Sequence, residues 1–408
     1  MMFRALLPNA LRDLTGSLRT AGRRAAENRT IEPQLLSKPH YDPPPRMRQA
    51  ELGDYEQIAA LQTRNGLRSR DHENWLEFWL NNPVYRRRGG NWPIGWVFEN
   101  ADSKIVGWHG NLPTAYYFAG RELVCVTSSP WVVDKPYRGY STLLLGHFTR
   151  QADVDLVVNT TAGASAEPVF HLFGYSKVPV GSWDKSAFWI TNYPEFLRIA
   201  LRMKGVPLAQ HLRYPSGAAL FLRDYFKAVH KDVGSSFAQI EECSQFDSRF
   251  DEFWERLKQD RCDTLLAIRS QETLEWHFRD QLALRQLWIL TASNESHIIA
   301  VAILDRRDRA NGLKCVRLVD FQSLRGWEKM LLPFLARARE KCRSEGIHCM
   351  EVTGCWLDRP GLPRVVPPHY HRLPSWILYY KARNQELSRA LQEPTTWAPS
   401  SYDGDASV

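Results

Sequence analysis

The second half of this 408-residue chain repeats the pattern of the first half, with an offset of about 190 residues. In each half a Leu-Glu-aromatic segment, at 74–86 and 272–285, is followed by a strand, a polar turn and a second strand. A third strand, a helix and a fourth strand then follow, at 122–163 and 313–354. Repetition of this kind indicates one supersecondary unit used twice. The length also suffices for two domains with cores of their own.

Composition excludes several classes of protein. The content of 44% hydrophobic and 24% charged residues is that of an ordinary globular protein. The net charge of +8 permits an anionic partner, but the basic residues are dispersed and no nucleic-acid-binding motif occurs, so we expect no nucleic acid partner. The seven cysteines form no CxxC pair, which argues against a disulfide framework or zinc site and fits a reducing compartment. We expect no transmembrane helix, because no run of 18 apolar residues is present.

An Arg-Gly turn joins a strand to a helix in the segment VDKPYRGYSTLLL, residues 133–145. The helix is expected at 141–152. The first amides of a helix lack partners within it, and the helix dipole favours an anion there. The turn therefore either cradles a phosphate or only makes a tight corner.

The surrounding elements, from about 46 to 180, resemble the GNAT (GCN5-related) N-acetyltransferase family. The resemblance is carried by MRQAELGDYEQIAAL, VVDKPYRGYSTLLLGHF and LVVNTTAGASAEPVFHLFGYSKVP. It implies an α/β fold with a mixed sheet. With the internal repeat, we expect two tandem GNAT-like domains, the second degenerate.

In that family, Arg/Gln-x-x-Gly-x-Gly/Ala binds the pyrophosphate of acetyl-CoA, the acyl donor. Arg138 takes the first position here, but Ser141 and Leu143 replace the small residues of the other two. The family also opens its fourth and fifth strands to admit the pantetheine arm. The implied cofactor-binding residues are Trp131, Val132, Val133, Arg138, Gly139, Tyr140, Ser141, Thr142, Leu143 and Asn159.

The chemistry implied is direct attack of an amine on the thioester, with a base for the amine proton and an acid for the thiolate. The tyrosine that many relatives use as the acid is Phe170 here, four residues before Gly174. His171 and Tyr175 are neighbouring substitutes. The candidate bases are His109 and Ser128, or Ser129, although a lone histidine on a strand is more often structural.

Four segments divide the chain. Residues 1–45 form a basic amphipathic arm and a Pro-rich linker, and the arm suits membrane contact, a targeting role or packing on its own protein. Residues 46–190 are the expected acyl-CoA-binding domain. Residues 191–235 are a helical, aromatic and basic connector, read as a packed linker, part of an acceptor groove or a membrane-facing surface. Residues 236–408 form the second domain, in which Glu328 would repel a phosphate.

We therefore expect a cytoplasmic N-acetyltransferase without a metal, with peripheral contact at the inner membrane face as a further option. Its acceptor is expected to be an amine of an amino sugar or glycoconjugate precursor, since the resemblance is nearest to bacterial proteins of cell-surface polysaccharide or glycolipid assembly. The Trp-rich segment NWPIGWVFEN suits sugar stacking or core packing equally. The alternatives are a FemAB-like aminoacyl or long-chain acyl transferase and a non-catalytic scaffold. The residues after Trp397 are expected to return to the domain and then fray.

Overall fold

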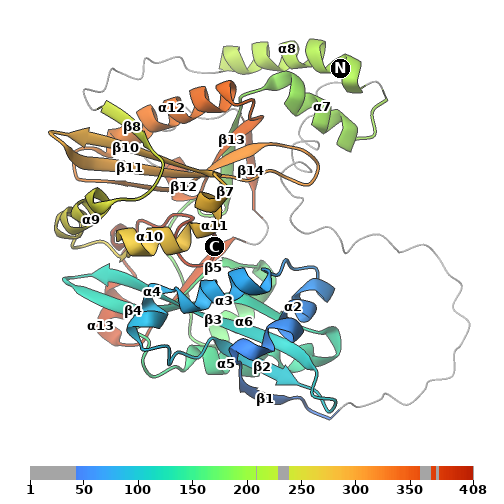
Figure 1. Ribbon diagram of the computed structural model, residues 1–408, viewed down its shortest axis with the longest axis vertical. Coiled ribbons are helices and arrows are strands. Elements are labelled where there is room, and N and C mark those ends of the chain that lie inside the picture. The colour runs from blue at the N-terminus through green and yellow to red at the C-terminus, as the bar shows by residue number, and fades with distance from the viewer. Residues whose placement is uncertain (1–42, 208, 228–238, 359–368, 374–375, 408) are drawn as a thin grey trace, which may run out of the picture.

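Two mixed β-sheets form the framework of the protein (Figure 1). The computed structural model describes residues 43–207, 209–227, 239–358, 369–373 and 376–407. The expected N-terminal arm, residues 1–42, lies outside them. In spatial order, the first sheet contains β1 (Arg46–Gln49), β2 (Gly95–Glu99), β3 (Ile105–Phe118), β4 (Arg121–Val133), β5 (Leu156–Ala162), β15 (Ile377–Ala382) and β6 (Ser176–Lys177), and β9 (Leu266–Ala267) pairs with β3. The second contains β8 (Gln239–Cys243), β10 (Leu287–Asn294), β11 (His297–Arg306), β12 (Cys315–Ser323), β13 (Cys349–Thr353), β7 (Lys185–Ile190) and β14 (His369–Arg372).

Helices cover both sheets and fill the space between them (Figure 1). Those of the first sheet are α2 (Tyr55–Arg64), α3 (His72–Leu80), α4 (Pro83–Arg87), α5 (Ser141–Thr149), α6 (Glu167–Leu172) and α13 (Gln385–Ala390). Those of the second are α7 (Tyr193–Met203), α8 (Ala209–Lys227), α9 (Ser248–Asp260), α10 (Gln271–His277), α11 (Arg279–Ala283) and α12 (Leu331–Ser344). Short 3-10 turns are η1 (Leu52–Asp54), η2 (Lys135–Tyr140), η3 (Ala164–Ala166), η4 (Glu328–Met330), η5 (Cys355–Asp358) and η7 (Pro394–Thr396).

Local sequence signals explain several helix ends. The side chains of Asp71, Asn82 and Ser270 accept bonds from the free amides that begin α3, α4 and α10. Gly174 ends α6 with a φ of +74°, a conformation that favours glycine, as expected for a C-cap. Asp54 directly precedes α2, but its side chain makes no capping bond to that helix. It accepts the Glu51 amide and pairs with Arg48 instead.

The repeat seen in the sequence is confirmed by the topology. Two short helices, three antiparallel strands, a helix and a parallel strand follow in the same order in each half, as α3–α4–β2–β3–β4–α5–β5 and α10–α11–β10–β11–β12–α12–β13. In the second half, η4 occupies the place that η2 occupies in the first half. The turn η4 begins with the acidic Glu328.

The halves exchange one strand. Strand β7 follows the first half in sequence but pairs with β13 in the second sheet, whereas β15 pairs with β5 in the first sheet. The expected boundaries, 46–190 and 236–408, therefore do not separate the two sheets. The sequence pattern did not reveal this because β7 and β15 are both short apolar strands that suit either sheet.

A single apolar cluster joins the two sheets. It includes Leu123 and Cys125 of β4, Leu266 of β9 and Ile289 of β10, all fully buried. Between the sheets a buried ion pair links Arg269 to Asp320, with Nε–Oδ2 at 2.7 Å. The interface between the halves is thus part of the core, which fixes their relative position.

Candidate functional site

The parallel strands β4 and β5 diverge in the middle of the first sheet. They pair only from Cys125–Leu156 to Thr127–Val158. Beyond this point β4 stays bonded to β3 as far as Val133, and β5 stays bonded to β15 as far as Ala162. The edge of β4 that faces β5 is therefore without a strand partner, and it can accept an extended ligand as an added strand.

Polar side chains without partners lie where the strands diverge. Asn159, on β5, is buried, and its Nδ2 donates to no described residue. Thr127, on β4, is also buried, and its Oγ1 bonds to nothing in the described part of the chain. Because buried polar groups are normally hydrogen-bonded, these atoms point to a ligand that completes them. Trp131, Val132 and Val133 are the last residues of β4 and lie along its open edge.

The Arg-Gly turn forms η2, and helix α5 begins directly after it at Ser141. The Ser141 amide donates to the Arg138 carbonyl, so it is not free for a phosphate. The Arg138 side chain is exposed, and its Nε donates to the Val133 carbonyl at 3.3 Å. Leu143 is 53% exposed and therefore leaves the inner side of the turn open.

The other turn residues lie as follows. A methyl group at Gly139 would contact nothing within 4 Å, so this position does not need glycine for space. Tyr140 and Thr142 are half-buried at the start of α5. The turn is accessible to a ligand, but it is not the glycine-rich cradle of the family pattern.

Two candidate bases are brought together. His109 Nε2 and Ser128 Oγ are 2.7 Å apart, across the irregular pairing of β3 with β4. His109 is fully buried, with its ring 4.4 Å from that of Phe148, and burial lowers its pKa to about 3. A histidine with this pKa is a weak proton acceptor at neutral pH. The geometry suits a pair that holds the two strands together.

The two candidate acids are not brought together. His171 is exposed on α6, with Nε2 3.6 Å from Glu167. Tyr175 is buried, its hydroxyl is 2.9 Å from Thr149 Oγ1, and burial raises its pKa. Phe170, at the place of the family tyrosine, is buried as well.

A tyrosine from the other half of the sequence lies beside Phe170. Tyr379, on the exchanged strand β15, stacks on Phe170 with ring centroids 4.9 Å apart. It pairs with Asn159 in the sheet, and its pKa is raised by burial and by the nearby Glu167. Sequence reasoning missed Tyr379 because the strand exchange that brings it here has no local signal.

The 400–407 segment was expected to fray, and this is wrong. Ser400, Ser401, Tyr402 and Ser407 are buried between the two halves. The Tyr402 hydroxyl donates to the Ile268 carbonyl at 2.6 Å. Small and acidic residues are typical of disordered ends, which is why the sequence suggested fraying.

This segment places a carboxylate at the open end of β5. Asp405 Oδ1 accepts a hydrogen bond from Thr160 Oγ1 at 2.6 Å, and Thr161 Oγ1 lies 3.3 Å from Oδ2. Both threonines follow Asn159 directly in β5. Burial raises the pKa of Asp405, which makes this carboxylate a better proton acceptor than an exposed one.

A second carboxylate lies deeper. Burial raises the pKa of Asp403 to about 6, against the attraction of the Arg269 guanidinium. Its Oδ2 accepts the Ser400 amide at 2.6 Å. Arg269 itself pairs with Asp320 and lies 4.8 Å from the ring of Tyr402.

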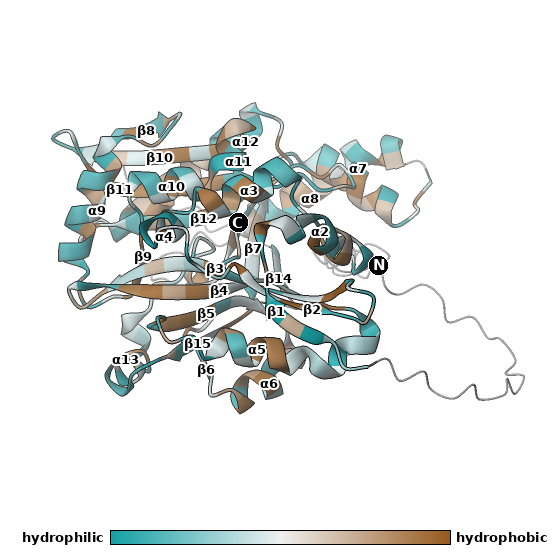
Figure 2. Ribbon diagram, turned by 60° about the horizontal axis from the view of Figure 1, so that its bottom comes forward, coloured by the Kyte–Doolittle hydropathy of each residue, from teal (hydrophilic) through white to brown (hydrophobic). Residues whose placement is uncertain are grey.

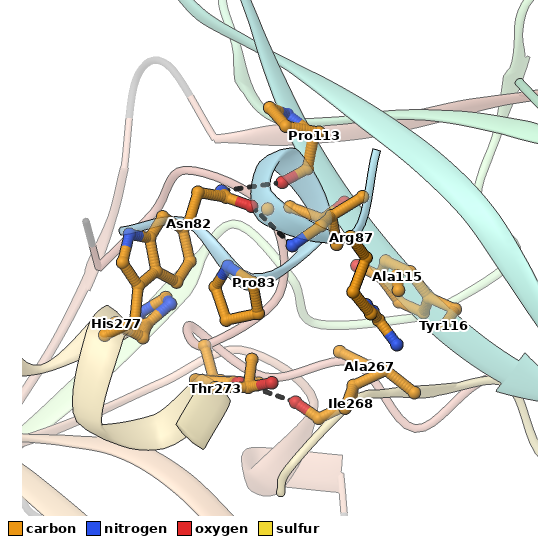
Figure 3. Close-up of a pocket in the computed structure, with 15 residues that line it drawn as sticks. Asn82, Pro83, Arg87, Pro113, Ala115, Tyr116, Ala267, Ile268, Thr273 and His277 are labelled. Carbon is orange, nitrogen blue, oxygen red and sulfur yellow. Dashed lines mark hydrogen bonds between the residues drawn. The ribbon is translucent and has the colours of Figure 1, made fainter. Parts of the chain in front are cut away.

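A narrow pocket between α4 and α10, partly open to solvent and with a cavity volume of about 30 Å³, leads to this segment (Figure 3). Arg87, Pro83 and Thr273 line it, together with Tyr116, whose buried hydroxyl bonds to no described residue. Gly404 forms part of the wall, against Thr160. The pocket therefore reaches the end of β5 from the side of the second half.

The Trp-rich segment 91–100 mainly packs the core. Trp92 is buried, and its Nε1 donates to the Asn111 carbonyl at 3.1 Å, while Trp96 is half-buried near His147. Among the described residues no cluster of His, Cys, Asp or Glu could hold a metal ion.

Comparison with solved structures shows the fold. A GCN5-related N-acetyltransferase from Anabaena variabilis ATCC 29413 is 12% identical, with 83% of this chain and 73% of that chain covered and a TM-score of 0.50. One from Kribbella flavida is 10% identical, with 85% and 72% covered and a TM-score of 0.51. N-myristoyltransferase of Saccharomyces cerevisiae, at 10% identity over 87% and 84% of the chains, has a TM-score of 0.48 and adds nothing to the assignment. By sequence the chain matches no protein family and no curated protein.

Proposed function

The chain has the fold of the GCN5-related N-acetyltransferases. We propose that the protein is an N-acyltransferase that transfers acetyl from acetyl-CoA to an amine, which attacks the thioester directly. The observation that carries this proposal is the divergence of β4 from β5 after Thr127 and Val158. It leaves a free strand edge for the pantetheine amides, beside the unbonded Nδ2 of Asn159. The pyrophosphate would then lie near the exposed Arg138.

Each group in the site is assigned one step of the proposed reaction. The Asp405 carboxylate takes the proton of the attacking ammonium, and the free amine adds to the thioester carbonyl. Amides of the open β4 edge stabilise the resulting oxyanion. The C–S bond then breaks, and the Tyr379 hydroxyl donates its proton to the leaving thiolate of CoA. The positively charged nitrogen of the intermediate loses its remaining extra proton, which passes through water to the Tyr379 oxygen, so the amide is neutral and the one net proton released is the one held by Asp405. The acceptor is proposed to approach from the side of the pocket, because Gly404 lines it and directly precedes Asp405 in the chain.

The acceptor proposed is an amino sugar or glycoconjugate precursor. The support is the resemblance in sequence, together with a pocket that combines apolar walls with Arg87. Trp92 no longer supports it, because this ring is packed in the core. The test therefore also includes donors with acyl chains longer than acetyl, and aminoacyl donors.

The test is calorimetric titration of the full chain with acetyl-CoA, beside Arg138→Glu and the control Arg86→Glu. Arg86 is an exposed arginine whose pairing with Glu272 takes no part in the site. Saturable binding that only Arg138→Glu weakens, followed by CoA release with an amino-sugar panel, is the expected result. Binding without thiol release would indicate a scaffold. If the protein binds a longer acyl-CoA or an acyl carrier but not acetyl-CoA, the proposed donor is wrong and the ligand that binds takes its place.

A further inference from the structure

The hairpin of α7 and α8 lies on the outside of the second sheet, at the top of Figure 1. Its inner side packs through Phe196, Ile199 and Leu220 against Phe188 and Ile190 of β7. The approach is close, because a methyl group at Gly217 would lie 3.2 Å from the Pro194 nitrogen. The inner side of α8 is therefore the side that packs on the rest of the protein.

The outer side of α8 is nonetheless apolar. Its exposed residues form two adjacent rows at helical spacing, Leu212, Pro215, Ala219, Leu222 and Phe226 in one, and Tyr214, Ala218, Phe221 and Tyr225 in the other. We call these nine residues the α8 face. Phe226 is 81% exposed and Tyr214 is 61% exposed. Apolar residues are visible along this hairpin in Figure 2. A continuous exposed patch of this kind marks an interaction site.

Basic residues outnumber acidic residues within the hairpin. The two acidic residues described between 193 and 227 are both neutralised, Glu195 by Arg198 and Arg213, and Asp224 by Arg223 and His369. Asp224 is also buried.

Exposed basic side chains lie where α7 ends. Arg202 is in the last turn of α7 and Lys204 follows this helix, and both side chains are exposed. His211, in the first turn of α8, is exposed as well. The hairpin thus presents aromatic and aliphatic residues bordered by positive charge.

We propose that the α8 face docks on an anionic lipid membrane. A surface helix with an apolar face, interfacial tyrosines and a basic border lies in the plane of such a membrane. None of the described helices is long and apolar enough to cross a bilayer, so α8 would rest at the interface. A symmetric contact with a second copy is disfavoured, because it would bring the same cations together. This inference does not depend on the proposed reaction.

The test is flotation of the full chain with vesicles of phosphatidylcholine alone and with 30% phosphatidylglycerol, an amount of about one anionic lipid in three. The test variant is Leu222→Ser with Phe226→Ser. The matched control is Leu80→Ser with Leu284→Ser, which changes two exposed leucines outside the α8 face. We expect wild type and control to float with the anionic vesicles, and the test variant to bind at least about tenfold more weakly. Binding to phosphatidylcholine alone should be weak in every case.

Hydrogen exchange on the same vesicles locates the contact, and α8 should be protected. Equal flotation of the test variant and the control would overturn the proposal, since the membrane would then be reached by another part of the chain. Failure of the wild type to float would also overturn it. A dimer in solution that Leu222→Ser with Phe226→Ser dissociates would assign the α8 face to a second copy instead.

Discussion

Replacing Gly404 by alanine tests whether the 400–407 segment must lie against β5. The residue has a φ of +68°, which costs an alanine about 1–2 kcal/mol. Its new methyl carbon would also lie 2.7 Å from Thr160 Cγ2 and 3.3 Å from Thr127 Oγ1. Thr160 is fully buried, so it cannot turn away. Overpacking of this kind costs about 1–3 kcal/mol more.

Gly120 supplies the matched control. It has a φ of +82° in the turn between β3 and β4, and a methyl group there would contact nothing within 4 Å. Gly120→Ala therefore carries the backbone penalty without the collision. The free energy of unfolding in urea should fall further for Gly404→Ala than for Gly120→Ala, by about 1–3 kcal/mol.

The activity assay separates stability from position. If Asp405 takes the amine proton, displacing the segment should lower kcat for CoA release at a temperature where both variants are folded. Acetyl-CoA affinity should change little, because the cofactor binds along β4. Equal unfolding energies and equal kcat for the two alanine variants would refute the packing argument and the role given to Asp405.

Three further substitutions probe buried polar groups. Arg269→Met leaves the Asp320 carboxylate buried without its cationic partner, so the free energy of unfolding should drop by about 3–5 kcal/mol, whereas Arg86→Met at an exposed pair should leave the urea midpoint unchanged. Asn159→Leu should preserve the midpoint, since Nδ2 has no described partner, yet raise the Kd for acetyl-CoA about tenfold by titration calorimetry. Asp403 has a raised pKa of about 6 in the folded state, so its ionisation destabilises the fold progressively between about pH 4 and 6. Asp403→Asn should remove this loss and raise the free energy of unfolding at pH 7, relative to that at pH 4, by about 3 kcal/mol; parallel pH curves for variant and wild type would contradict it.

The repeat made most of the fold predictable. The Leu-Glu-aromatic segments at 74–86 and 272–285 became helix pairs in both halves, and the strands that follow took the expected order. Helix α5 began at Ser141, as the turn before it suggested. These features depend on local spacing, which a single sequence displays directly.

The site was less predictable, because its parts come from distant segments. His109 and Ser128 were singled out separately, and only the pairing of β3 with β4 shows that they touch. Tyr379 and Asp405 had no motif at all. The strand exchange places Tyr379, and burial of the polar 400–407 segment places Asp405. Pairings between remote segments leave no periodic trace in a sequence.

The exchange of β7 and β15 also bears on how the protein is made. Strand β5 leaves the ribosome early, but the neighbour that completes its sheet begins only at Ile377. Until then the edge of β5 that pairs with β15, from Leu156 to Ala162, has no strand partner, and such edges pair readily with other chains. The first sheet therefore cannot close before β15 has been made. A nascent chain halted near residue 370 would contain every motif that marks the first half, but its first sheet would still be incomplete.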